Sequence, residues 1–165
     1  MTIKAAIFDL DGTLVNLPID YRALYAEFRK ITRIKNIEPV TKTVASLNEP
    51  LREKVFEIWT RAEFVILPKM TIVKKGIDLY GQYSKIPKAL VTMQGQKTVE
   101  KILHTLNLSF EAVITREDSL DRVAQITLAL EKLTSKPENV IVVSDRETDK
   151  AAAEKIGCKF KTVKT

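Results

Sequence analysis

The sequence predicts an α/β fold of three layers, in which helices cover both faces of a parallel β-sheet. Short apolar runs rich in valine and isoleucine recur along the chain, as they do in strands that are buried on both faces. Amphipathic helical patterns alternate with these runs, and this order implies right-handed crossovers between parallel strands. A stretch from Leu17 to about Pro68 contains no convincing strand, which predicts a small helical insertion.

Five strands are predicted. The first is the apolar run that begins at Ala5 and leads into "FDLDGT". The other four cover Lys88–Met93, Glu111–Arg116, Asn139–Asp145 and Lys159–Val163. The 165 residues are enough for one domain with its own core and a small insertion.

Helical patterns fill the segments between these strands. Residues 96–108 and 121–133 carry apolar side chains at helical spacing, and residues 72–85 form a helix that leads into the second strand. The pattern over 148–158 includes Gly157, which is a natural helix stop.

The insertion is predicted to hold two clear helices and one weaker helix. Residues 20–31 place aromatic and aliphatic side chains on one stripe, with Asp20 as the N-cap. Residues 48–64 do the same, with Asn48 as the cap, and the helix near Val40–Leu47 has the weaker pattern. We therefore expect residues 1–16 and 69–165 to form the core domain and residues 17–68 to form the insertion.

The composition excludes several classes of protein. Hydrophobic residues make up 45% of the chain and charged residues 29%, which is typical of a soluble globular protein. No apolar run approaches the ~20 residues of a membrane span, and the N-terminus lacks the features of a signal peptide. The single Cys158 cannot form an internal disulfide, so we expect a cytoplasmic protein in which Cys158 is a small apolar residue rather than a nucleophile.

The single histidine and the net charge are also informative. His104 has no histidine or cysteine partners nearby, so a zinc site is not expected. We expect His104 to lie on the solvent-facing side of a helix. The net charge of +6 is spread along the chain, without a nucleic-acid-binding motif. A nucleic acid is therefore not an expected partner, and a positive field serves an anionic small substrate equally well.

Polar residues follow several predicted strands at the points where the strands end. Asp9 and Asp11 follow the first strand, Thr92 follows the second, and Asp145 and Asp149 follow the strand over 139–145. The carboxyl ends of parallel strands meet at one edge of the sheet, where such folds bind ligands. Several carboxylates at one edge repel one another without a cation, and oxygen ligands alone favour Mg²⁺. The alternative is that each acid caps a helix or turn. This alternative explains Asp149 alone and stays open for Asp145, but it does not explain Asp9 and Asp11 together.

The order of these motifs resembles the haloacid dehalogenase-like hydrolases. "DLDGT" at Asp9–Thr13 resembles their first motif, "ALVT" at Ala89–Thr92 their second, and "VVSDRETD" at Val142–Asp149 their fourth. The resemblance extends over nearly the whole chain, including a helical insertion after the first motif. It implies a Rossmann-like three-layer core with a small α-helical cap.

The resemblance also implies a phosphate-ester chemistry for the two aspartates of the first motif. Asp9 would attack phosphorus and become an aspartyl-phosphate. Asp11 would protonate the leaving oxygen and then activate water, so its pKa must be raised relative to that of Asp9. The carboxylates of Asp9 and Asp145 and the carbonyl of Asp11 would hold Mg²⁺, and Asp149 would support the site through water or by holding the basic residue.

Phosphate contacts are implied for two loops. Gly12 and Thr13 would let the backbone turn tightly with its amides facing the phosphate. Thr92 would donate its hydroxyl, and Met93 its amide, to phosphoryl oxygens.

The third motif departs from the family pattern. The family has a lysine, often followed by proline, before the helix that precedes the fourth strand, and "TREDSLDRVAQ" lacks both. Arg122 is the first candidate for this role because it lies at the helix start, and Arg116 is the second. A solvated helix position for Arg122 is the alternative. Ser144 replaces a usual glycine, and Met93 follows Thr92 where a small or amide residue is common, so slow activity is open as well.

These motifs favour a phosphatase that acts on a small phosphorylated metabolite, such as phosphoglycolate or a sugar phosphate. Asp11 favours it over a dehalogenase, because a halide leaving group needs no proton. A phosphomutase and a catalytically weak binding protein are the alternatives. The insertion would close over the site, where some of its basic and aromatic residues could contact the leaving group: Arg22, Tyr25, Trp59, Arg61 and Lys69. Tyr25 and Trp59 fit the core of the insertion equally well, and the oligomeric state is open.

Overall fold

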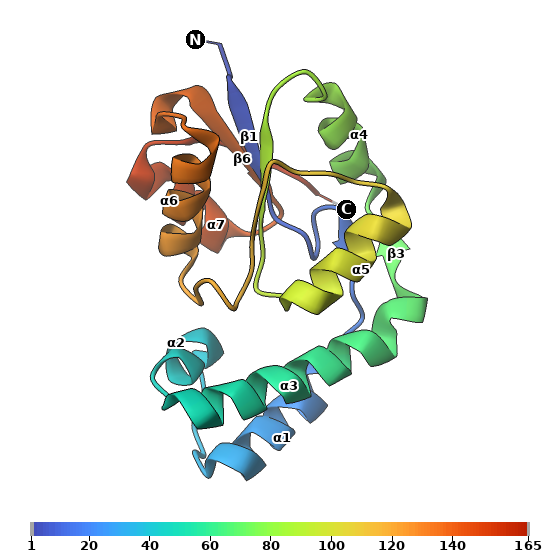
Figure 1. Cartoon of the computed structure of the whole chain (residues 1–165), viewed down its shortest axis with the longest axis vertical. Coiled ribbons are helices and arrows are strands. Elements are labelled where there is room, and N and C mark those ends of the chain that lie inside the picture. Colours follow the sequence, from blue (N-terminus) through green and yellow to red (C-terminus); the bar gives the residue numbers. More distant parts are fainter. Residues whose placement is uncertain (1, 165) are drawn as a thin grey trace.

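The computed structural model describes residues 2–164 and contains a five-stranded parallel sheet (Figure 1). The spatial order of the strands is β5 (Ala112–Ile114), β4 (Lys88–Val91), β1 (Ala5–Phe8), β6 (Val140–Ser144) and β7 (Lys159–Thr162). The central strand β1 pairs in parallel with both β4 and β6. All five predicted strands are present, and the three-layer α/β fold is confirmed.

Helices cover both faces of this sheet, and alternate residues of β1 show the two layers. Ala5 and Ile7 pack with α6 (Arg122–Leu133) and α7 (Glu147–Ile156). Ala6 and Phe8 face the opposite side, in the cluster that contains residues of α4 (Lys74–Gln82) and α5 (Gln96–Leu106). A strand with both faces covered has no polar side, which explains its continuous apolar sequence. A short 3₁₀ helix, Pro137–Asn139, leads into β6.

A second, two-stranded sheet was not predicted. Strand β2 (Val15–Asn16) pairs antiparallel with β3 (Thr71–Ile72), so the two chain segments that enter and leave the helical insertion lie side by side. The helix expected over 72–85 is correspondingly shorter and begins at Lys74. Two-residue strands carry no periodicity, so the sequence pattern does not reveal them.

The insertion consists of α1 (Tyr21–Thr32), α2 (Val40–Ala45) and α3 (Glu49–Ile66), followed by a 3₁₀ turn at Leu67–Lys69. The side chains of Asp20 and Asn48 accept hydrogen bonds from Ala23 N and Leu51 N, as N-caps do. These helices have their own apolar cluster, formed by Leu24, Phe28, Ile37, Val40, Val44, Val55 and Trp59. Figure 1 shows them beyond the carboxyl ends of β1 and β6.

The remaining expectations about single residues agree with the structure. His104 is exposed on α5, and Cys158 is buried after Gly157, which ends α7 in the left-handed conformation. Burial raises the pKa of the Cys158 thiol to about 11, so it is a poor nucleophile at neutral pH. Within residues 2–164, no helix is both long enough and apolar enough to cross a membrane.

Candidate active site

The loop after β1 is a tight turn built around one carbonyl group. The Leu10 carbonyl accepts hydrogen bonds from the amides of Thr13, Leu14 and Val15, at 2.9–3.2 Å. Gly12 has a φ of 84°, and a Cβ there would lie 2.3 Å from Oδ2 of Asp145. Glycine is thus required both for the left-handed backbone and for the close approach of the Asp145 carboxylate.

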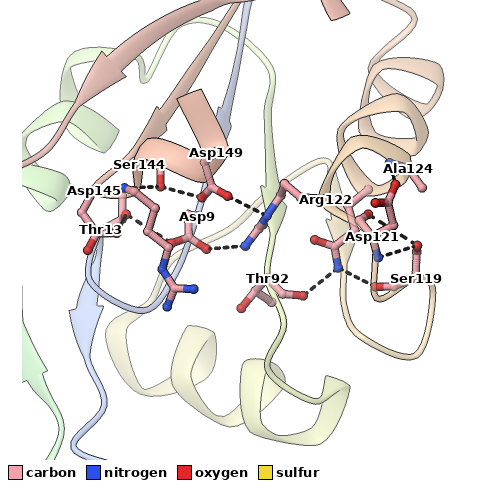
Figure 2. A network of polar contacts seen from close by, with 12 residues as sticks. Asp9, Thr13, Thr92, Ser119, Asp121, Arg122, Ala124, Ser144, Asp145 and Asp149 are labelled. Carbon is pink, nitrogen blue, oxygen red and sulfur yellow. Dashed lines mark hydrogen bonds and ion pairs between the residues drawn. The ribbon is translucent and has the colours of Figure 1, made fainter. Parts of the chain in front are cut away.

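Asp9 lies at the base of this loop and is only 3% exposed. The Thr13 hydroxyl lies 3.5 Å from Oδ2 of Asp9 and 3.3 Å from Oδ1 of Asp145, so two carboxylates approach one hydroxyl (Figure 2). Burial raises the pKa of Asp9 to about 6, although the positive charge of Arg122 opposes this rise. Because this value already includes the effect of Arg122, a further positive charge is needed to keep Asp9 fully ionised near neutral pH.

Arg122 contacts both Asp9 and Asp149. Its Nη2 lies 3.2 Å from Oδ1 of Asp9, and its Nε lies 3.1 Å from Oδ1 of Asp149. Figure 2 shows the guanidinium between the two carboxylates. The Asp121 side chain caps α6 by accepting from Ala124 N at 2.9 Å, which fixes Arg122 as the first residue of that helix.

Asp149 is engaged on both carboxylate oxygens. Oδ1 faces Arg122, and Oδ2 accepts a 2.6 Å hydrogen bond from the Ser144 hydroxyl. Ser144, which stands where the family has glycine, thus orients Asp149 while lying fully buried. This arrangement leaves Asp149 as a support for Arg122 rather than as a free ligand.

The Asp11 side chain contacts the backbone at the start of the insertion. Its Oδ1 accepts a hydrogen bond from Leu17 N at 2.9 Å, at the start of the insertion. Burial raises the pKa of Asp11, and the hydrogen bond from Leu17 partly offsets this rise. Burial raises the pKa of Asp9 as well, so the expected order of the two pKa values with Mg²⁺ bound stays a prediction.

The loop after β4 brings Thr92 and Met93 to the same edge. Thr92 is fully buried, and its hydroxyl donates a hydrogen bond to the side-chain oxygen of Gln94. The Thr92 carbonyl accepts from Gln125 Nε2 at 2.9 Å, so a buried side chain of α6 fixes the start of this loop. A phosphoryl oxygen bound to Thr92 would have to replace Gln94 as its partner.

A cavity of about 200 Å³ lies over Asp9. Core residues form one wall, and the helical insertion forms the other. The core wall consists of Asp9, Met93, Gln94, Arg122 and Arg146, and the insertion contributes Tyr21, Tyr25, Val40, Thr41 and Trp59. Of the five residues named from the sequence as contacts of the leaving group, only Tyr25 and Trp59 line the cavity. The other three are exposed and lie outside it: Arg22, Arg61 and Lys69.

Comparison with known proteins agrees with this geometry. The family model of haloacid dehalogenase-like hydrolases matches residues 6–163. The chain belongs to this family. A phosphoglycolate phosphatase of Aquifex aeolicus is 25% identical over 176 residues, which cover 95% of this chain and 83% of that protein.

Solved structures of this hydrolase family share the fold. A haloacid dehalogenase-like hydrolase of Streptococcus pneumoniae superposes with a TM-score of 0.69 at 20% identity, over 97% of this chain and 84% of that one. CbbY of Rhodobacter sphaeroides, solved with phosphate, gives 0.72 at 17% identity, over 96% and 85% of the two chains.

The two candidates for the third motif of this haloacid dehalogenase-like hydrolase lie in different places. Arg122 contacts Asp9, whereas the guanidinium of Arg116 is buried against Glu63 of α3. Arg146 also lines the cavity. Burial lowers its pKa, but the negative charges of the four surrounding aspartates together outweigh this effect and raise it: Asp9, Asp149, Asp11 and Asp145. The sequence analysis missed Arg146, although its place directly after Asp145 puts it at the same edge.

The residues of this hydrolase fit a magnesium ion in part. Within residues 2–164, no three side chains of the His, Cys, Asp or Glu type already surround one point. Mg²⁺, however, is usually held by one or two carboxylates and keeps several waters. Asp9 and Asp145, which approach the same hydroxyl, are a suitable carboxylate pair, and a backbone carbonyl such as that of Asp11 is a suitable third donor.

Proposed function

We propose that this hydrolase is a Mg²⁺-dependent phosphatase that cleaves a small phosphate monoester through an aspartyl-phosphate at Asp9. The observation that carries the proposal is the contact of Arg122 with Asp9, at 3.2 Å, inside a cavity that the insertion covers. A buried carboxylate beside a cation is suited to attack a dianionic phosphoryl group. The similarity to a phosphoglycolate phosphatase supports the same reading.

In the first step, an Asp9 oxygen forms a bond to phosphorus, and the bond from phosphorus to the leaving oxygen breaks. Asp11 gives its proton to that oxygen. In the second step, Asp11 takes a proton from water, the water oxygen attacks phosphorus, and Asp9 is released as a carboxylate with inorganic phosphate as product. Arg122 would donate hydrogen bonds to the phosphoryl oxygens in both steps.

Mg²⁺ held by Asp9, the Asp11 carbonyl and Asp145 would supply the charge that lowers the pKa of Asp9 and offsets its repulsion from phosphate. The protein groups alone raise the pKa of Asp9 to about 6, which is why such a charge is needed. Asp149 would hold Arg122, and the amide of Met93, after Thr92, would donate to a phosphoryl oxygen. The amides of Thr13, Leu14 and Val15 already donate to the Leu10 carbonyl, so they are not counted among the phosphate donors. Residues 17–68 would act as the cap that excludes water and selects the substrate.

The test is hydrolysis of p-nitrophenyl phosphate and phosphoglycolate with Mg²⁺, comparing wild type with Asp9→Asn. We expect phosphate release by the wild type and a loss of at least 10³-fold in the variant, because the amide cannot form the covalent intermediate. Chelation of the metal should also abolish the activity. Equal, negligible rates of both proteins over a range of pH would exclude a phosphatase and favour a binding protein. Isomerisation of a sugar phosphate without release of inorganic phosphate would favour a phosphomutase.

A further inference from the structure

Arg116 and Glu63 form an ion pair in the interior, between the core and the insertion. Arg116 follows β5, and Glu63 lies in α3, 53 residues earlier in the chain. Nη1 of Arg116 lies 2.8 Å from Oε2 of Glu63, and Nη2 lies 3.0 Å from Oε1. Both side chains are fully buried, so this two-pronged contact is shielded from water.

The rest of the Arg116 guanidinium is also surrounded by α3. It lies 4.5 Å from the ring centre of Trp59 and 5.6 Å from that of Phe56. Nη2 donates to Thr60 Oγ1 at 2.7 Å. These α3 residues follow the helical spacing of one face, so the single Arg116 side chain contacts that face of the helix over residues 56–63.

The same ion pair contacts the loop after β4. Arg116 Nη1 donates to the Met93 carbonyl at 3.2 Å, and Glu63 Oε1 accepts from Gly95 N at 3.3 Å and from Thr98 Oγ1 at 2.8 Å. Gly95 has no room for a side chain, because a Cβ would lie 2.6 Å from Arg116 Nη2. The loop is therefore held from the side of the insertion as well as from α6.

A buried ion pair is a costly way to stabilise an interface. The free energy of removing two charges from water often cancels their attraction, and an apolar pair of similar size is often as stable. What the two charged groups add here is a fixed orientation of the loop at residues 92–95, because each of them also has a backbone partner in that loop.

We propose that Arg116 and Glu63 are positioning residues, which make the geometry of the loop at residues 92–95 depend on the docking of α3. The inference rests on the proposed function, in which this loop binds the phosphoryl group. Arg116 acts through the Met93 carbonyl and Glu63 through the Gly95 amide, and neither lines the cavity over Asp9. The cap thus shapes the phosphate site directly, in addition to covering it.

The test compares Arg116→Met, Glu63→Gln and the double variant Arg116→Met/Glu63→Leu. Either single variant leaves one buried charge without its partner and can fail to fold. The double variant removes both charges, so it keeps the interface apolar while it loses the links to Met93 and Gly95. The control is Lys74→Ala/Asp78→Ala, which removes an exposed ion pair of α4.

Hydrogen exchange of the folded proteins is the first measurement. In the double variant, the amides of residues 92–98 should exchange at least tenfold faster, while those of residues 140–156 keep their rates. The second measurement is phosphate release, where kcat should fall at least tenfold with KM changed less than threefold. The control variant should match the wild type in both measurements.

Unchanged exchange at residues 92–98 in the folded double variant would overturn the inference, whether or not the protein is a phosphatase. Faster exchange with an unchanged kcat would overturn it too, because the pair would then be a structural link only. If the wild type itself hydrolyses no phosphate ester, the proposed function fails, and the exchange rates alone decide whether α3 sets the loop.

Discussion

The fold changes the pKa of the Asp9 carboxyl group. Its carboxyl group is buried, and burial is the largest cause of the rise of its pKa to about 6 from an ordinary 3.8. The folded chain therefore binds this proton more tightly than the unfolded chain does. The contribution of Asp9 to stability is fully present below pH 3.8 and is lost as the pH rises through 6.

We accordingly expect Asp9→Asn to stabilise the metal-free protein at pH 7.5, because an amide mimics the protonated acid. The gain should approach about 3 kcal/mol at pH 7.5, at 1.4 kcal/mol per pKa unit, and should vanish near pH 4. Denaturant unfolding in the presence of a chelator measures it. Asp78→Asn, at an exposed carboxylate of α4, should change far less between the two pH values. If Asp9→Asn stabilised the protein more at pH 4 than at pH 7.5, the pKa of Asp9 would not be raised by folding.

The sequence left two interpretations of Arg122 open: a cation of the active site or a solvated helix residue. A solvated helix residue can be replaced with little effect, whereas a cation that contacts both Asp9 and Asp149 cannot. Arg122→Ala should lower kcat for phosphate release by about 10²–10³-fold, the usual effect of losing one group that stabilises transition-state charge. Arg122→Lys should keep more of the activity, because a charge remains although the planar fork is lost. Equal activity of Arg122→Ala and the wild type would rule out this role.

At the scale of single elements, α4 packs so closely against the loop after β1 that there is no room for a side chain at Gly76. A Cβ on Gly76 would lie 1.6 Å from the Thr13 carbonyl oxygen, whereas a Cβ on Gly81 in the same helix would meet nothing within 4 Å. Gly76→Ala should therefore destabilise the protein by about 3 kcal/mol or more, since the helix must move off the loop. Gly81→Ala should stabilise it by about 0.5–1 kcal/mol through helix propensity. Urea unfolding checks both, and a tolerated Gly76→Ala would show that the contact is not needed.

The elements also show how far a sequence pattern reaches. The strands of the large sheet, the caps at Asp20 and Asn48 and the stop at Gly157 are local features, so the sequence alone predicts them. The β2–β3 pair is too short for a pattern, and it forms because the two ends of the insertion must meet.

The Arg116–Glu63 pair joins residues that are far apart in the sequence, so no local signal announces it. Arg116 could be named from the sequence as a basic residue near the site. Its partner could not be named, because the choice depends on how α3 packs against the core.

At the scale of the whole molecule, residues of the helical insertion and of the core together line the cavity over Asp9. The cavity of about 200 Å³ is smaller than the ~300 Å³ at which pockets for drug-sized ligands begin. The core wall carries the charged groups, and the wall formed by the insertion is largely aromatic and aliphatic. We therefore expect the site to accept a phosphate ester with a leaving group of a few carbons and to exclude a nucleotide.

Tyr25 lines the cavity from the side of the insertion, and replacing it tests whether the size of the cavity selects the substrate. It packs against Phe28 with ring centres 6.0 Å apart and against Tyr21 at 5.6 Å, so removing it enlarges the cavity from the cap side. We expect Tyr25→Ala to raise the kcat/KM ratio of 1-naphthyl phosphate to phosphoglycolate by about tenfold. Arg22→Ala, an exposed neighbour on α1 outside the cavity, should leave that ratio unchanged. If both variants keep the wild-type ratio, the cap opens far enough during turnover that its closed shape does not select the substrate.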